Sequence, residues 1–385
     1  MTLTANWNYP TAVRIGPGRI VELAQACRVA GIKRPLLVTD PGLSKLPMIA
    51  RALSILRDDG LTAEVFDRVQ PNPVDGNIAD GLAVYRAGLH DGVVAFGGGS
   101  ALDAGKVIAF MAGQTRPMWD FEDIGDWWTR ADPAGIAPIV AVPTTAGTGS
   151  EVGRAGVVTN SATHTKKVIF HPLMLPKVVI CDPELTVGLP AVVTAGTGID
   201  ALSHCLEAYC APGFHPLADG IAAEGVRLVH DFLRRAVADG SDIEARTNMM
   251  AAAAMGATAF QKGLGAMHAL AHPVGAIYNT HHGMTNAVVM PYVLAFNREA
   301  VAVKLARLAA YIGEPASYEG FLAWVLDLRR AVGVPHTLAE FGVPLDRIDE
   351  LSAMSIVDPT AGGNPVALTL EGAKALYQAA HTGTL

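Results

Sequence analysis

The chain of 385 residues has little of the features that mark several common classes of protein. Its four cysteines show no CxxC spacing, which indicates neither a zinc knuckle nor a disulfide framework. It has no cluster of lysine and arginine, and its net charge of -7 does not suit the phosphates of nucleic acids. No apolar run reaches the roughly 18 residues that a membrane-spanning helix needs. We therefore expect small molecules as partners, with no nucleic acid and no membrane.

The beginning of the sequence also lacks a targeting signal. Residues 1–18, MTLTANWNYPTAVRIGPG, have neither the basic start nor the long apolar core of a secretory signal peptide. Together with the isolated cysteines, this favours a reducing compartment, and we expect a cytoplasmic protein. What the chain does have is a 50% share of apolar residues, enough for a sizeable core, and a length that allows two domains.

The two halves of the sequence differ in composition and in their expected secondary structure. In the first half, short β-rich runs alternate with helical stretches, at residues 34–40, 62–69, 92–99, 136–145 and 177–185. This alternation predicts β-α units and a parallel sheet. Beyond DPELTVGLP, near residues 183–190, long segments rich in Ala, Leu and Met predict helices. We therefore expect an α/β nucleotide-binding domain with a parallel sheet at 1–185, an all-α metal and substrate domain at 186–385, and a cleft between them.

A glycine-rich turn in the first half is a candidate phosphate site. The run GVVAFGGGSALDAGK predicts a strand, then Gly98, Gly99 and Ser100, then a helix with Asp103 in its first turn. Glycines let the backbone approach a phosphate closely, and the helix N-terminus offers free N–H groups. The pattern is neither the Rossmann fingerprint nor a Walker loop, and an ordinary tight turn is the alternative.

A second loop and an acidic residue strengthen the nucleotide hypothesis. The run VPTTAGTGSEV follows another strand and carries the hydroxyls of Thr144, Thr145 and Ser150. Two such loops after neighbouring parallel strands are typical of a nucleotide crevice. Asp40 follows a third strand, where its carboxylate can bind a ribose 2′-hydroxyl and would repel a 2′-phosphate, which favours NAD over NADP. A turn-forming role before Pro41 is equally compatible with the sequence.

The second half places polar residues in apolar surroundings. In GIDALSHCLEAY, Asp200 and His204 have the spacing that puts both side chains on one face of a helix. A buried, hydrogen-bonded pair explains this spacing as well as a metal site does. Four more histidines stand in MHALAHPVGAIYNTHHG: His268, His272, His281 and His282. One oxygen donor with several imidazoles suits Fe²⁺ or Zn²⁺, and the cluster favours a metal site.

The sequence resembles the iron-containing (group III) alcohol dehydrogenase family. The resemblance covers nearly the whole chain and rests on five motifs in matching order and spacing: GGGSALDAGK, PTTAGTGSEV, DPELT, GIDALSHCLEAY and GLGAMHALAHPVGAIYNTHHGMTNAVVMP. It implies an N-terminal α/β nucleotide-binding domain, a helical metal domain and at least a dimer. Around Asn364 and Pro365 the sequence departs from the family pattern, which puts the identity of the substrate in doubt.

The resemblance also implies roles for single residues. The metal ligands fall on Asp200, His204, His268 and His282, and His272 matches a non-ligand histidine near the nicotinamide or in proton transfer. His281 is taken as a loop residue or a group behind the ligands. The cofactor, NAD, is expected to contact residues that match the family's nucleotide site: Asp40, Gly98, Gly99, Ser100, Asp103, Thr144, Thr145, Ser150 and Lys167, with Lys166 as the alternative to Lys167.

These assignments predict an enzyme that interconverts a short-chain primary alcohol, or an ω-hydroxy acid such as 4-hydroxybutyrate, and its aldehyde. A divalent metal, Fe²⁺ or Zn²⁺, would act as Lewis acid, NAD would accept the hydride, and His272 would pass the proton to solvent. The alternatives are a glycerol-type or maleylacetate-type oxidoreductase, a lyase of the dehydroquinate synthase kind, and a binding protein without turnover. The lyase would need a basic pocket, which the second half does not suggest.

Overall fold

The computed structural model describes residues 11–163 and 165–385. The described chain divides into two compact units. The α/β unit comprises residues 11–145 and 149–187, and the helical unit comprises residues 146–148 and 188–385. Most of the sequence read above as lacking a targeting signal, up to residue 10, lies outside the described residues.

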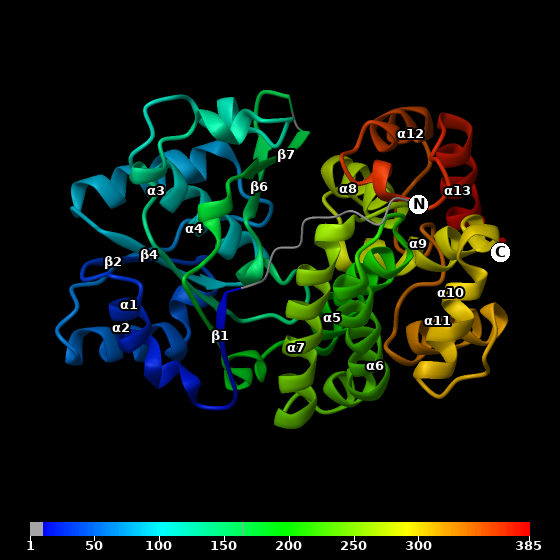
Figure 1. The fold of residues 1–385 in the computed structure, drawn as a ribbon, viewed down its shortest axis with the longest axis horizontal. Helices are drawn as coiled ribbons and strands as arrows, with labels where there is room; N and C mark the ends of the chain where they lie inside the picture. Colours follow the sequence, from blue (N-terminus) through cyan, green and yellow to red (C-terminus); the bar gives the residue numbers. More distant parts are fainter. Residues whose placement is uncertain (1–10, 164) are drawn as a thin grey trace. The chain divides into compact units, whose positions relative to one another are not determined.

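The α/β unit is built on a six-stranded parallel sheet with the order β1-β8-β5-β4-β2-β3 (Figure 1). The strands are β1 (Ala12–Ile15), β2 (Pro35–Val38), β3 (Glu64–Phe66), β4 (Gly92–Gly97), β5 (Ile139–Pro143) and β8 (Val178–Cys181). Each of the five β-rich runs contains one of these strands, so the predicted fold class is confirmed. The edge strand β1 was not predicted.

Helices bury both faces of the sheet. The helices α1 (Leu23–Val29) and α2 (Pro47–Asp58) share a core with Leu37, Val94 and Val140, while α4 (Gly99–Met111) lies on the opposite face, where Gly105 approaches Ala95. The helix α3 (Asp75–Ala87) packs beside α4. Because both faces are covered, the central strands are apolar throughout rather than alternating.

A two-stranded antiparallel hairpin, β6 (Ala155–Asn160) and β7 (Thr165–Phe170), accompanies this sheet. The sequence did not predict it, because its residues are largely half-buried and include Thr, Asn and Lys as well as apolar residues. The strand β6 packs on α4. The hairpin therefore adds side chains to the part of the unit where the glycine-rich turn lies.

The other unit is helical, as predicted for the second half. It contains α5 (Ala191–Cys210), α6 (Pro216–Ala238), α7 (Ile243–Ala259), α8 (Ala266–Tyr278), α9 (His282–Phe296), α10 (Arg298–Tyr311), α11 (Tyr318–Ala331), α12 (Ile348–Ile356) and α13 (Leu370–Thr382). The helix α5 is central, because it packs against α6, α7 and α9. The helix α8 continues through Pro273 to Tyr278 rather than ending there. None of the helices in the described ranges is long and apolar enough to cross a membrane.

Candidate active site

The helix α5 carries the first two candidate ligands. Asp200 and His204 lie one turn apart on it and are 2% and 5% exposed, so both polar groups are buried in the helical core. The i, i+4 spacing read from the sequence therefore puts both side chains on one face, as expected. Buried polar groups of this kind need partners or a bound ion.

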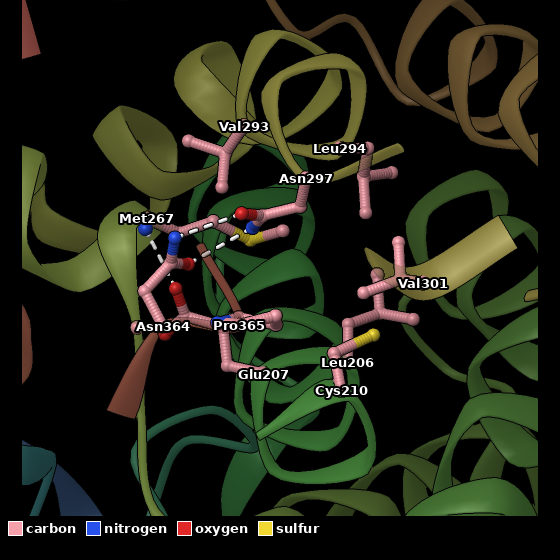
Figure 2. A pocket seen from close by; sticks show the side chains of 11 residues that line it. Leu206, Glu207, Cys210, Met267, Val293, Leu294, Asn297, Val301, Asn364 and Pro365 are labelled. Carbon is pink, nitrogen blue, oxygen red and sulfur yellow. Dashed lines mark hydrogen bonds between the residues drawn. The ribbon is translucent and has the colours of Figure 1, made fainter. Parts of the chain in front are cut away.

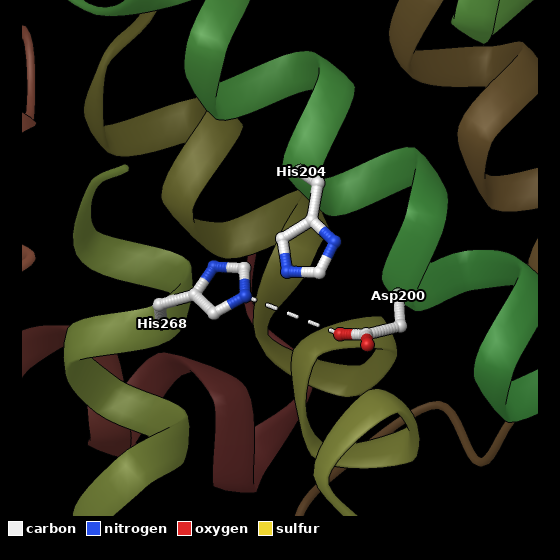
Figure 3. Close-up of side chains that lie close together, drawn as sticks. All are labelled: Asp200, His204 and His268. Atoms are coloured by element: carbon white, nitrogen blue, oxygen red, sulfur yellow. Dashed lines mark ion pairs between the residues drawn. The ribbon is translucent and has the colours of Figure 1, made fainter. Parts of the chain in front are cut away.

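His268, from the third position of α8, joins this pair (Figure 3). Ligand atoms of Asp200, His204 and His268 lie within 4.8 Å of one another. The imidazole rings of His204 and His268 are stacked, with centroids 4.7 Å apart, and His268 Nε2 is 4.0 Å from Asp200 Oδ1. Two helices thus bring one carboxylate and two imidazoles to one buried point.

His282 and His281 begin α9 and have different surroundings. His282 lies outside the group of three, but its Nε2 is 3.6 Å from Asp200 Oδ1. His281 is the N-cap of α9, and its Nδ1 accepts a hydrogen bond from Met284 N at 3.3 Å. The residue after His282 must be glycine, because a Cβ at Gly283 would lie 2.2 Å from the carbonyl oxygen of Gly196 on α5. This close approach of α9 to α5 sets His282 beside Asp200.

Asn286, one turn after His282, lies between the candidate ligands. Its Nδ2 is 2.9 Å from Asp200 Oδ1 and 3.2 Å from Nε2 of both His268 and His282. The side chain is completely buried. Three of the four predicted ligands therefore converge on the same amide group, which is direct evidence that their donor atoms face one another.

The pKa values of the two buried imidazoles shift in opposite directions, and only that of His204 shifts toward the neutral form that binds a metal. Burial lowers the pKa of His204 to about 4, although Asp200 opposes the shift, so this imidazole is neutral at neutral pH. Burial also disfavours the charged form of His268, but the carboxylates of Glu207 and Asp200 outweigh it, and its pKa is raised. A neutral imidazole beside a carboxylate fits a divalent metal.

His272 lies one turn beyond His268 on α8 and is held from the C-terminal part of the chain. Its Nδ1 is 2.9 Å from Asp358 Oδ2, and its ring stacks on that of His282 with a centroid distance of 5.3 Å. Burial raises the pKa of Asp358, but hydrogen bonds from His272 and Thr360 more than offset this and hold it below its usual range. The side chain of His272 remains 25% exposed. It is therefore an oriented imidazole with access to solvent.

In the α/β unit, the glycine-rich turn has the predicted strand, turn and helix, but Asp103 is the fifth residue of α4 and lies beyond the first turn in which it was predicted. Gly97 ends β4 with a φ of 148°, a conformation that favours glycine, and Gly98 is the N-cap of α4. Gly99 and Ser100 form the first turn of α4, so their backbone N–H groups lie at the helix N-terminus. A Cβ at Gly98 would meet nothing closer than Thr145 Cγ2, at 3.4 Å. The fold alone does not demand glycine there, whereas close contact with a phosphate would.

The other strand ends bring three predicted cofactor residues to the same edge of the sheet. Thr144 N donates to the carbonyl oxygen of Gly97 at 2.9 Å, and Thr145 follows at the end of β5. Asp40 follows β2, and its Oδ1 accepts hydrogen bonds from Gly42 N and Leu43 N, both at 2.9 Å. Asp40 thus has the turn-forming role that the sequence left open. One of its oxygens makes these bonds, and the ribose role stays a prediction.

Asp103 and Ser150 contact each other and hold loops together. Asp103 Oδ1 accepts from Ser150 Oγ at 2.5 Å, and Oδ2 accepts from Val157 N at 3.0 Å. Lys106, which is buried, donates to the carbonyl oxygens of Ser150, at 2.9 Å, and Ala155. These bonds fix the second loop and β6 onto α4. Asp103 therefore helps to hold the second loop and β6 in place, through its hydrogen bonds with Ser150 and Val157.

Lys167 lies on β7 of the hairpin. It pairs with Val158 across the two strands, and its Nζ is 2.8 Å from Glu122 Oε1 and 3.1 Å from Glu122 Oε2. Its neighbour Lys166 stands opposite Thr159. The structure thus gives Lys167 a carboxylate partner that the sequence did not suggest.

Three residues at the candidate metal centre were missed from the sequence: Glu207, Asn286 and Asp358. Glu207 contacts His268 Nδ1 at 2.6 Å, and the contacts of the other two are described above. Helical spacing could have indicated two of the three. Glu207 is three residues after His204 and Asn286 is four after His282, so each shares a helix face with a candidate ligand. Asp358 had no such signal, since it meets His272 from 86 residues away.

Comparisons with known proteins agree with this arrangement. A family model described as "Iron-containing alcohol dehydrogenase" matches residues 10–183, and its C-terminal counterpart, "Fe-containing alcohol dehydrogenase family, C-terminal", matches residues 194–381.

Individual relatives match over almost their whole length. The chain is 41% identical to a 4-hydroxybutyrate dehydrogenase of Cupriavidus necator over 368 residues, 93% of this chain and 94% of that protein. It is 35% identical to an NAD-dependent methanol dehydrogenase of Bacillus methanolicus, covering 95% and 97%. The crystal structure of a 1,3-propanediol oxidoreductase superposes with a TM-score of 0.93 at 38% identity, covering 98% of this chain and 100% of that one.

Proposed function

The chain belongs to the iron-containing alcohol dehydrogenase family, and we propose that it interconverts a short-chain primary alcohol, or an ω-hydroxy acid such as 4-hydroxybutyrate, and the corresponding aldehyde. It is an oxidoreductase that acts on CH–OH groups, in a family that uses NAD and a divalent metal. The observation that carries the proposal is the buried group of Asp200, His204 and His268. This donor set can hold a metal that an alcohol also approaches.

We assign the metal to Asp200, His204, His268 and His282. The family description supports Fe²⁺, and the same oxygen and nitrogen donors also accept Zn²⁺. When bound, the metal supplies a Lewis acid for the alcohol oxygen and NAD supplies the hydride acceptor. Asn286 supports the arrangement from within the protein, because its amide donates to Asp200 Oδ1 and so orients that carboxylate.

His272 is our candidate for moving the proton of the alcohol. The carboxylate of Asp358 accepts from Nδ1, which leaves Nε2 as the nitrogen that gains and loses a proton in the neutral ring. Its partial exposure offers a path for that proton to solvent. Asp358 acts through His272, as the positioning residue that fixes its tautomer and the orientation of its ring.

For NAD, we assign the pyrophosphate to Gly98, Gly99 and Ser100 at the N-terminus of α4. Free backbone N–H groups and the helix dipole favour an anion there. We assign the remaining contacts to residues at the strand ends and on the second loop and hairpin: Asp40, Asp103, Thr144, Thr145, Ser150 and Lys167. Ser150 and Asp103 support the loop through their mutual hydrogen bond. These assignments give the α/β unit, which contains all of them, the nucleotide-binding role and the helical unit the metal and substrate role.

A carboxylate-bearing substrate would need a cationic anchor, and Lys262 is a poor candidate. Its side chain is 2% exposed, its Nζ pairs with Asp219, and it also donates to the carbonyl oxygen of Tyr209 at 3.3 Å. Among the two substrate classes, this favours uncharged primary alcohols and diols unless another cation serves as the anchor.

We further propose a cytoplasmic homo-oligomer, a dimer or larger. The four cysteines are all free and buried, as suits a reducing compartment. The edge strand β1 exposes Val13 and Ile15, each at 38%, and an edge strand with apolar side chains is suited to pairing with a second copy. Light scattering of the purified protein tests the oligomeric state.

The substrate assignment is tested by a panel assay. The protein is stripped of metal and reloaded anaerobically with Fe²⁺ or Zn²⁺, and reduction of NAD⁺ is followed with short primary alcohols, diols and 4-hydroxybutyrate. We expect the highest kcat/KM for one of these alcohols. Activity with none of them, while NAD⁺ still binds, would refute the proposal and favour the lyase or the binding protein.

A further inference from the structure

The N-terminus of α8 is buried and has no cap of its own. Ala266, Met267 and His268 form its first turn and are all buried, while the N-cap position is Gly265, which has no side chain. The first N–H groups of a helix have no partner within it, so a buried start requires acceptors from elsewhere. The acceptors for the N–H groups of Ala266 and Met267 come from distant parts of the chain.

Two side-chain oxygens serve as these acceptors. Ala266 N donates to Asn364 Oδ1 at 3.1 Å. Met267 N donates to Glu207 Oε1 at 2.6 Å (Figure 2). A Cβ at Gly265 would lie 2.9 Å from Asn364 Oδ1 and 3.1 Å from Glu207 Oε1, so the absence of a side chain there lets both oxygens approach. The cap of α8 is therefore supplied by α5 and by the segment before α13.

The second oxygen of the same carboxylate holds a candidate metal ligand. Glu207 Oε2 lies 2.6 Å from Nδ1 of His268. An ionised carboxylate can only accept, so the proton of the neutral ring is on Nδ1 and the lone pair is on Nε2. Nε2 is the nitrogen that lies 4.0 Å from Asp200 Oδ1. The contact thus sets the tautomer that metal coordination needs.

Glu207 has little freedom to move away from these contacts. It is 5% exposed and lies on α5, one turn beyond His204. The cavity beside it, which Cys210, Met267 and Asn364 also line, has a volume of about 10 Å³, room for at most about one water (Figure 2). One helix therefore carries Asp200, His204 and the carboxylate that orients the ligand from α8.

We propose that Glu207 is a positioning residue whose single carboxylate both caps α8 and presents His268 Nε2 to the metal, so that α5 and α8 form the centre as one preorganised unit. This inference rests on the proposed metal site and adds a residue to it. It explains how a helix start without a cap of its own can hold a ligand in a fixed orientation. Loss of the carboxylate should weaken metal binding although Glu207 is not itself a ligand.

The variant Glu207→Gln separates the two roles. An amide can accept from Met267 N through its oxygen, but its NH₂ group then faces His268 Nδ1 and forces the proton of the ring onto Nε2. We expect the Kd for Zn²⁺, measured by competition with a chromophoric chelator, to rise by about 10 to 100-fold, the usual effect of losing an outer partner. The Tm of the metal-free variant should change little, because the cap remains.

The matched control is Asn364→Ala. It removes the acceptor of Ala266 N and keeps the contact between Glu207 and His268. We expect it to lower the Tm of the metal-free protein and to leave the Kd for Zn²⁺ within about threefold. A weakening of Zn²⁺ binding equal to that in Glu207→Gln would instead show that the cap, not the histidine contact, matters, and would overturn the proposal.

A measurement on the unmutated protein does not depend on how any variant folds. In ¹⁵N-histidine-labelled, metal-free protein, with His268→Ala used for assignment and at a pH high enough for the His268 ring to be neutral, we expect its proton on Nδ1. A proton on Nε2 would refute the proposal, as would an unchanged Kd in Glu207→Gln. If the unmutated protein bound no divalent metal at all, the proposed metal site would fail instead, so the two failures are distinguishable.

Discussion

At the scale of single residues, the two adjacent histidines at the start of α9 show how the neighbours of a side chain define its role. His281 caps the helix through Met284 N, while His282 turns Nε2 toward Asp200. The sequence alone gives both the same chemistry. Only the close approach of Gly283 to α5 decides which of them reaches the metal centre.

This pair provides a matched prediction. We expect His282→Ala to raise the Kd for the metal by more than the 10 to 100-fold typical of an outer partner. In His281→Ala the Kd should stay nearly constant, while stability falls by about 1 kcal/mol through loss of the cap. Chelator competition and urea unfolding measure the two quantities. Equal metal affinities in the two variants would contradict the assignment of His282.

Asp358 leads to a second residue-level prediction. An amide at this position in Asp358→Asn no longer requires the proton of His272 to be on Nδ1, so proton transfer should slow. We expect kcat to fall by about tenfold or more, with the 10²–10⁴ that general acid–base catalysis contributes as the upper bound. The Kd for the metal and the KM should change far less. Steady-state kinetics with chelator competition checks both, and a fall in metal affinity matching that in kcat would point to a structural role.

The residues of the site differed in how far they could be predicted. The proximity of Asp200, His204, His268 and His282 could be predicted from helical spacing, residue type and family resemblance, and their role as ligands stays a prediction. Their partners come from other elements and have ordinary side chains. Glu207 meets His268 from 61 residues away, a contact that exists only once α5 and α8 have packed.

At the scale of elements, the strand-to-helix turn before α4 combines a tight backbone with an anion site. Gly97 is required by its positive φ, whereas at Gly98 an added Cβ would meet only ordinary contacts. We expect Gly98→Ala to keep the Tm within a few degrees while it raises the Kd for NAD⁺ by tenfold or more, because the methyl group would stand where a phosphate approaches. Titration calorimetry tests this. Unchanged NAD⁺ affinity would refute the assignment of the pyrophosphate to this turn.

Glu151, in the second loop, makes the stability of the α/β unit depend on pH. Burial raises its pKa from the usual 4.5 to about 7, so the folded state holds this proton more tightly than the unfolded state does. Stability should therefore fall as the pH rises from about 5 to 8, by about 1.4 kcal/mol for each unit between the two pKa values. Glu151→Gln should lessen this decline in urea unfolding. An equal decline in both proteins would show that Glu151 is not responsible.

Four of the five strands predicted from the sequence are buried on both sides, and the fifth, the edge strand β3, is partly exposed. The strands β2, β4, β5 and β8 are apolar along their whole length, because helices cover both faces of the sheet. The edge strand β1 is mostly exposed and the hairpin β6–β7 is largely half-buried, so neither gives a continuous apolar run. Partial burial thus accounts for the elements that were missed.

At the scale of the whole molecule, the two kinds of site belong to different units. The candidate metal ligands all lie within residues 188–385, and the candidate cofactor residues all lie within residues 11–145 and 149–187. The two binding events should therefore be separable by mutation. His268→Ala should retain NAD⁺ binding, and Gly98→Ala should retain metal binding.

The measurement that tests the account most directly is a titration of the metal-free protein with Fe²⁺ under anaerobic conditions, with formation of NADH from a primary alcohol as the signal. We predict that the rate is near zero without metal, rises in proportion to added Fe²⁺, and saturates at one equivalent per chain, with no such rise in His268→Ala. Full turnover in the metal-free protein, or saturation that His268→Ala leaves unchanged, would contradict the assignment of the reaction to this centre.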